Sequence, residues 1–400
     1  MSCTVFGDKN FKKHLERSVS RQYMIKTNIQ EFPQGIIVNE QKHGFGVFDK
    51  DFRFVKSSRQ VRKNNSQFIP RFNHKDIPYV DEDVIFIGNV YPAFGHFLLE
   101  HMNRAYVLLN KKYKKLKVVL INNKGVNPVP NYMFELLELL GVNRNDILIL
   151  NETTRFKKVV VPSQGFNIPV YSSTDFGKTF DVMADAVKDI PDVAEKIYVS
   201  RGALKSRRTF GEVVVQKIFE KNGFKIIYPE TLPLKQQISY ARNCKVLAGI
   251  AGTALHLALF MRSGGTVIQI KRNRLPKCNA DVQYLIDSTK ELDTVFVSGS
   301  VEEKPTEHYS SVPQIIGVNK YMRVFFDVYN FKLTEQEAKA DKKDMAEYNA
   351  ALDEYNKRYS GVWLNALKHK IVHYSACLIP GRERRGRWRN WLKKKLNAEG

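Results

Sequence analysis

Short apolar runs alternate with segments of helical spacing between residues 84 and 270, and this alternation restricts the fold more than any other feature. The expected strands are 84–87, 117–121, 146–150 and 158–162, then 197–200, 224–228, 245–248 and 266–270. The expected helices between them are 96–110, 132–140, 181–189, 212–222, 234–243 and 253–261. Strands that alternate with helices form parallel sheets covered by helices. The pattern predicts an α/β protein with two Rossmann-like, doubly wound halves and a ligand-binding cleft between them.

The flanking segments predict smaller units around these halves. Residues 1–80 contain a hairpin with alternating apolar positions and form a β-rich N-terminal segment. Residues 334–358 are rich in Ala, Glu and Lys with apolar residues on one face, which predicts a helix that packs back on the halves. We therefore expect units at 1–80, 81–180, 181–320, 321–380 (C-terminal helices) and 381–400 (a basic tail).

The charge balance predicts an anionic partner. The chain has 64 Lys and Arg against 41 Asp and Glu, a net charge of +23. Such a charge attracts nucleic acid, a phospholipid surface or a phosphorylated substrate. In residues 382–395, Arg and Lys are interleaved with Trp388 and Trp391. This pattern suits an anionic membrane surface at least as well as RNA, although a solvated tail is the commonest outcome.

Cysteine usage and hydropathy favour the cytoplasm. The four cysteines have neither metal-binding nor disulfide spacing, which is typical of a reducing compartment. No apolar run approaches the length of a membrane span, and the polar N-terminus shows no signal-peptide pattern. We therefore expect a cytoplasmic protein.

A histidine and a glutamate lie at the first strand–helix junction. His96 and Glu100 are four residues apart, so on a helix both face the carboxyl edge of the sheet. Either group could take a proton from an attacking hydroxyl. The alternative is that the two residues only pair with the backbone or with each other.

Two stretches of the second half are candidates for phosphate binding. Arg201, Lys205, Arg207 and Arg208 follow the strand at 197–200, and four cations this close suit a bound polyanion or a solvated basic loop. Between another strand and helix, two glycines would let backbone N–H groups approach a phosphate, and Thr253 could cap the helix. This second stretch contains Gly249, Gly252, Thr253 and His256.

One acidic motif is set aside. Asp81, Glu82 and Asp83 fit the loose Asp-x-Asp pattern of metal-dependent sugar transfer. They precede an expected strand, at the end of the sheet opposite the candidate residues, so we interpret them as a solvated turn. No Walker loop, zinc spacing or Ser/His/Asp triad is recognisable.

The ordered set of motifs resembles glycosyltransferase family 61, especially its bacterial capsular polysaccharide branch. The resemblance covers roughly residues 35–300, by order-of-magnitude judgement of where the motif spacing holds. Ala251, Gly211 and Gln269 depart from residues common in the family. The matching positions are 95–100, Ser200, Arg201, Arg207, Arg208, Glu212, 223–224, 229–230, Leu234, Gln237, Gly249, 252–256, Phe260 and 266–270.

The resemblance implies a GT-B-type inverting enzyme. It implies an acceptor in the half at 81–180, with His96 or Glu100 as base, and a nucleotide sugar in the half at 181–320. The donor, expected to be UDP-linked, would contact Arg201, Lys205, Arg207, Arg208, Glu212, Gly249, Gly252, Thr253 and His256. The cations and the helix start could stabilise the departing diphosphate without a metal, and no cofactor is expected.

We therefore predict a cytoplasmic glycosyltransferase, peripheral to the inner face of the cell membrane through its basic tail. Its acceptor would be a capsular or lipopolysaccharide glycan or a lipid-linked precursor, and nucleic acid is not expected as a partner. Two alternatives stay open: a basic nucleic-acid-binding protein, favoured by the charge, and a sugar-phosphate transferase on the same scaffold.

Overall fold

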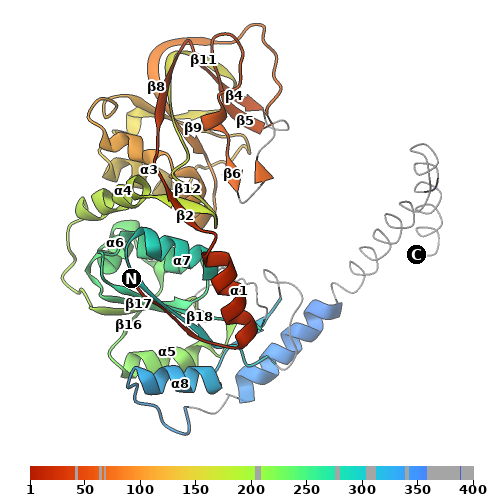
Figure 1. The fold of residues 1–400 in the computed structure, drawn as a ribbon, viewed down its shortest axis with the longest axis vertical. Helices are drawn as coiled ribbons and strands as arrows, with labels where there is room; N and C mark the ends of the chain where they lie inside the picture. Colours follow the sequence, from red (N-terminus) through yellow and green to blue (C-terminus); the bar gives the residue numbers. More distant parts are fainter. Residues whose placement is uncertain are drawn as a thin grey trace.

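The protein is a mixed α/β structure with two large sheets in different halves of the molecule (Figure 1). This computed structural model describes residues 1–40, 44–62, 65–66, 69–202, 209–274, 280–302, 312–337, 342–357 and 388. The predicted α/β class is confirmed. All eight strands expected between residues 84 and 270 are present, and they lie in the two large sheets.

The first sheet has seven strands and is partly antiparallel. Its parallel strands lie in the order β10 (Ile147–Leu150), β9 (Lys117–Ile121), β8 (Tyr79–Asn89) and β11 (Thr154–Pro162). Strands β3 (Ile29–Pro33) and β4 (Ile36–Glu40) pair antiparallel with β11, and β5 (Gly44–Phe48) pairs with β4. The predicted hairpin thus extends the first sheet.

The second sheet has six strands, all parallel. Its order is β1 (Cys3–Phe6), β19 (Asp293–Ser298), β18 (Thr266–Lys271), β17 (Val246–Ile250), β14 (Lys196–Val199) and β16 (Lys225–Ile227). The sequence pattern did not predict β1 or β19. Because β1 pairs with β19, the N-terminus contributes an edge strand to the second sheet while the hairpin serves the first.

The short strands connect segments far apart in sequence. β13 (Tyr171–Ser173) pairs with β12 (Phe166–Asn167) and with β2 (Tyr23–Ile25). β15 (Thr209–Phe210) pairs with β20 (Gln314–Ile315), and β6 (Val61–Arg62) pairs with β7 (Asn65–Ser66). The longer helices include α1 (Lys9–Val19), α3 (Asn131–Leu139), α4 (Thr174–Asp185), α5 (Glu212–Lys221), α6 (Leu234–Asn243), α7 (Ala280–Thr289) and α8 (Lys320–Val328).

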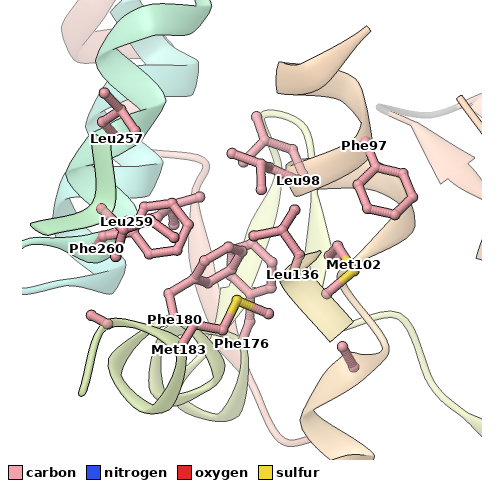
Figure 2. Packing of buried hydrophobic residues seen from close by; sticks show 14 of the residues in the cluster. Phe97, Leu98, Met102, Leu136, Phe176, Phe180, Met183, Leu257, Leu259 and Phe260 are labelled. Atoms are coloured by element: carbon pink, nitrogen blue, oxygen red, sulfur yellow. The ribbon is translucent and has the colours of Figure 1, made fainter. Parts of the chain in front are cut away.

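One apolar cluster runs through both halves (Figure 2). Leu98 and Met102 come from the first half, Leu257 and Phe260 come from the second, and Phe180 of α4 lies between them. The Phe180 ring contacts the Phe260 ring edge-on at 5.3 Å. Burial of aromatic side chains is a large stabilising term, so this shared core fixes the two halves against each other.

Helix α8 and the helical residues 342–357 pack on the second half. Phe325 and Phe326 of α8 join the core on one face of the second sheet. The ring of Tyr348 contacts Phe210 at 6.1 Å and belongs to a small cluster with Ile315. Of the helix predicted at 334–358, residues 342–357 are helical, but residues 335–337 form a turn instead, and 358–400, apart from Trp388, lie outside the described residues.

Several sequence-based expectations were wrong, and the helix expected at 181–189 begins and ends earlier, as α4. The regular helix expected at 96–110 is divided into α2 (Phe94–His96), the π-helix η2 (Phe97–His101) and the 3-10 helix η3 (Ala105–Leu109). The acidic residues 81–83 form no turn but lie within β8. Their carboxylates pair with lysines: Asp81 with Lys157, Glu82 with Lys117 and Asp83 with Lys158. Ion pairs to lysines of the neighbouring strands therefore explain why three acidic residues occur together here.

Within the part of the chain that the structure describes, no helix has the length and apolar character needed to cross a membrane.

Candidate functional site

His96 and Glu100 form a hydrogen-bonded pair at the carboxyl end of β8. His96 is the last residue of α2, and Glu100 lies in the π-helix η2. The His96 Nδ1 atom bonds to Glu100 Oε2. If the carboxylate accepts this bond, Nδ1 carries the proton and Nε2 keeps a lone pair. The π-turn, closed by Met102 N–H donating to Phe97 O at 2.9 Å, is a local irregularity common at functional sites.

The second oxygen of Glu100 faces Arg62. The Arg62 Nε atom lies 3.4 Å from Glu100 Oε1. Burial alone would raise the pKa of Glu100, but the hydrogen bond from His96 and the charge of Arg62 outweigh it and hold the pKa below its ordinary value. Glu100 is therefore a carboxylate near neutral pH, held between an imidazole and a guanidinium.

The sequence analysis missed three neighbours of this pair: Tyr91, His101 and Lys124. The Tyr91 ring contacts His96 at 5.3 Å and stacks on His101 at 5.5 Å, and Lys124 Nζ lies 4.0 Å from the Tyr91 ring centroid. Burial lowers the pKa of His101 to about 3. Its Nδ1 accepts the Asn89 N–H at 3.3 Å, so His101 is a neutral packing residue. The adjacency of His101 to Glu100 was the only signal in the sequence.

Gly95 brings the two candidate stretches together. A Cβ atom at this position would collide with Thr253 Cγ2 and lie 2.9 Å from His256 Nδ1. The first turn of α2 therefore lies directly against the start of η6 (Thr253–Phe260) in the second half. Burial, followed by the charge of His96, lowers the pKa of His256 to about 4, so its imidazole is neutral.

The two glycines of the second stretch, Gly249 and Gly252, are required for different reasons. A Cβ at Gly249 would lie 2.7 Å from Val199 Cγ2 and 2.8 Å from Val199 O, so close packing of β17 on β14 requires glycine there. A Cβ at Gly252 would lie 2.8 Å from Arg201 Nη1. Gly252 thus leaves room for the Arg201 guanidinium beside the turn, while Gly249 serves the sheet.

The start of η6 differs from the expected cap. Gly252 is its N-cap residue, no side-chain hydrogen bond caps the turn, and the segment is a 3-10 helix. The expectation that Thr253 caps a helix here was therefore wrong. Thr253 is the exposed first residue of η6, beside Gly95.

Glu212 is buried beside two guanidinium groups. It is the first residue of α5 and is 3% exposed, and its Oε1 accepts the Arg201 N–H at 3.1 Å. Burial raises the pKa of Glu212 to about 7, against the opposing bond from Arg201 and the charges of Arg201 and Arg272. Glu212 therefore anchors the start of the Arg201 loop from inside the protein.

Arg272 is a second cation that the sequence analysis did not single out. It directly follows β18, and its Nη1 lies 3.5 Å from Thr209 Oγ1. Because β14, β17 and β18 are adjacent parallel strands, Arg201, Gly252 and Arg272 lie at one edge of the second sheet. Next to Arg272, the Asn273 side chain is 1% exposed, and neither of its amide atoms has a hydrogen-bond partner in the described structure. A lone arginine after a strand gave too little signal in the sequence.

Lys205, Arg207 and Arg208 lie outside the described residues, so their part in the site stays a prediction. Among the described residues, no group of three His, Cys, Asp or Glu side chains is placed to hold a metal ion. The candidate site therefore consists of the pair His96 and Glu100 in the first half, facing Gly252, Thr253 and His256 in the second, with Arg201 and Arg272 behind them.

Comparison with protein families gives one match. Residues 94–268 match the family described as Glycosyltransferase 61. The matched range begins at α2, beside Gly95, and ends within β18, so it includes both candidate stretches. No curated protein matches the chain significantly.

We predict that replacing Glu212 with Gln changes how stability depends on pH. Since the pKa of Glu212 is about 7 in the folded protein and 4.5 ordinarily, the folded state holds this proton more tightly. The stability of the native protein relative to Glu212→Gln should therefore fall between about pH 4.5 and pH 7, by on the order of 3 kcal/mol in total, and stay level above that. Urea unfolding across this range measures the difference. If the unfolding free energies of the native protein and of Glu212→Gln changed in parallel with pH, the prediction would be contradicted. Contributions from other buried acids are the same in both proteins and cancel in the difference.

Proposed function

The chain carries a domain of glycosyltransferase family 61, which makes it a glycosyltransferase, and we propose that it is an inverting enzyme using a nucleotide-sugar donor. The observation that carries this proposal is the close contact of Gly95 with Thr253 and His256. It brings a proton-accepting pair from one half against a phosphate-binding type of turn from the other. This juxtaposition suits a GT-B-type arrangement, with the acceptor in the first half and the donor in the second.

His96 is the proposed base on the acceptor side. With Nδ1–H bonded to the Glu100 carboxylate, Nε2 is free to accept a proton from the attacking hydroxyl. The hydroxyl oxygen forms a bond to the anomeric carbon while the bond from that carbon to the diphosphate oxygen breaks. Direct displacement inverts the anomeric configuration. Glu100 orients the imidazole and stabilises its protonated form, and Glu100 itself as base is the alternative.

The proposed donor site is the edge that carries Arg201 and Arg272. Negative charge grows on the leaving diphosphate as the glycosidic bond breaks, and guanidinium groups fixed beside it lower the barrier. Lys205, Arg207 and Arg208 follow Arg201 in sequence and would add to this charge. We propose that the cations act without a metal and that the donor is UDP-linked. The partnerless amide of Asn273 suits a polar group of the donor.

The proposed acceptor is a surface glycan, of capsule or lipopolysaccharide, or its lipid-linked precursor. We further propose that the enzyme is cytoplasmic and binds the inner membrane face through the tail at 381–400, because Arg and Lys interleaved with Trp suit an anionic lipid surface.

Deletion of the tail tests the membrane proposal. A chain truncated before Arg382 should lose co-sedimentation with anionic phospholipid vesicles at low salt, since the polybasic attraction is removed. Neutral vesicles are the control. Unchanged co-sedimentation of the truncated chain would refute the membrane role.

Replacing His96 with Ala should abolish most of the transfer activity. Loss of a general base lowers kcat by about 10²- to 10⁴-fold. Glu100→Gln keeps a hydrogen-bond acceptor for Nδ1–H, so its loss should be smaller. His14→Ala, on α1 in the second half, is the control. Full turnover in His96→Ala together with inactivity of Glu100→Ala would instead make Glu100 the base. Mass analysis of the product separates sugar transfer from sugar-phosphate transfer.

Replacing Arg272 with Ala should weaken donor binding. A charge-assisted contact contributes about 1.5–3 kcal/mol, so the Kd for UDP should rise by roughly 10- to 100-fold. Thermal shift against a panel of nucleotides and nucleotide sugars measures this, because a bound donor stabilises the fold. Arg323→Ala, on α8, is the matched control. An unchanged Kd in Arg272→Ala would remove this residue from the donor site.

A further inference from the structure

Two cations lie at opposite ends of one chain of contacts through the candidate site. Lys124 lies over the Tyr91 ring, Tyr91 contacts His96, His96 bonds to Glu100, and Glu100 pairs with Arg62. Both cations belong to the first half: Arg62 ends the short strand β6, and Lys124 lies in the turn after β9. The donor-side arginines, in contrast, follow strands of the second sheet.

The position of Arg62 is fixed by buried polar groups. The neighbouring Val61 donates its N–H to Gln164 Oε1 at 2.9 Å, and its carbonyl accepts from Gln164 Nε2 at 2.8 Å. Just upstream, the fully buried Arg104 donates to the carbonyls of Ser57 and Arg59 at 3.1 and 2.9 Å. Because the Arg104 guanidinium donates hydrogen bonds to these backbone carbonyls, it holds the segment that leads to Arg62 in one conformation.

Lys124 is also presented by a fixed loop. Asn122 Oδ1 accepts the Val126 N–H at 2.8 Å, and Asn122 N–H donates to Leu150 O at 2.8 Å. Gly125 has a φ of 60°, a left-handed conformation that favours glycine and closes the turn. The side chain of Lys124 itself is exposed.

The contacts of Arg62 and Lys124 contribute too little to the folding free energy to explain why these cations lie here. The Arg62 side chain is 53% exposed, and an ion pair this accessible to water contributes little. The ion pair joins Arg62 Nε to Glu100 Oε1, and an exposed lysine over a tyrosine ring gains about 0.5–1 kcal/mol. A substrate is a better reason for two exposed cations whose backbone segments are fixed on either side of a proposed base.

We propose that the acceptor is anionic, with a phosphate, diphosphate or carboxylate close to the accepting hydroxyl, bound by Arg62 and Lys124. An anionic group near the Glu100 carboxylate would be repelled unless cations flank it, and these two residues supply that charge. The planar guanidinium of Arg62 suits two-point contact with a phosphate or carboxylate, and Lys124 acts as a mobile point charge.

This inference rests on the proposed function, and the test separates the two. Binding to the full-length protein saturated with UDP is measured by calorimetry, so that the donor site is filled. The probes are alkyl diphosphate-linked hexoses, alkyl glycosides ending in a uronic acid, and neutral alkyl hexosides. The variants are Arg62→Gln and Lys124→Gln, with the exposed Arg71→Gln and Lys111→Gln as matched controls.

We expect the native protein to bind one anionic class at least about 10-fold more tightly than the neutral hexosides. In each site variant the affinity for that anionic class should fall by about 10- to 100-fold, as for the loss of a charge-assisted contact, while the controls keep the preference. Preference for the diphosphate probe would identify a lipid-linked diphosphate as source of the anion, and preference for the uronate would identify an acidic glycan.

Equal binding of anionic and neutral probes would overturn the proposal, and so would a preference that both variants retain. If Arg62→Gln or Lys124→Gln weakened UDP binding as much as Arg272→Ala, these cations would belong to the donor site instead, and the proposal would fail. Failure of UDP to bind the native protein would count against the proposed donor, while the same probes titrated without UDP would still test the acceptor preference.

Discussion

The close approach of α2 to the start of η6 is the contact on which the candidate site depends. It exists because residue 95 is glycine: any Cβ there would collide with Thr253. The apolar cluster around Phe180 supplies the force that holds the halves together, and the absent side chain at Gly95 sets how closely their polar edges meet. Hydrophobic packing and the site are therefore parts of one arrangement.

Electrostatics in this protein depend on burial more than on the net charge of +23. Arg104 is strongly basic, but its guanidinium donates hydrogen bonds to backbone carbonyls inside the protein, so its role is to hold the fold. Glu212 is acidic, but burial raises its pKa to about 7, so near neutrality its proton occupancy changes beside Arg201 and Arg272. Glu100 behaves in the opposite way, because His96 and Arg62 outweigh its burial. The pKa values of these two glutamates thus shift in opposite directions because their partners differ.

Much of the fold could be predicted because its signals are local. The helix expected at 234–243 has the bounds of α6, and the helix expected at 212–222 differs from α5 by one residue. Edge strand β1 was missed because a four-residue strand at the N-terminus has no periodic pattern, and it forms only by pairing with β19. The break of 96–110 into three short helices was missed because packing, rather than apolar spacing, produced it.

The sequence by itself determined the two α/β series, the chemical types at their strand ends and the resemblance to family 61, since these depend on residue order alone. It placed His96 four residues from Glu100 and Gly252 beside Thr253. Only the tertiary structure decided that Gly95 meets His256, that Arg272 shares Glu212 with Arg201, and that Arg62 reaches Glu100. Such contacts join residues far apart in the chain, and they are selected by the packing of whole sheets, which no local pattern encodes.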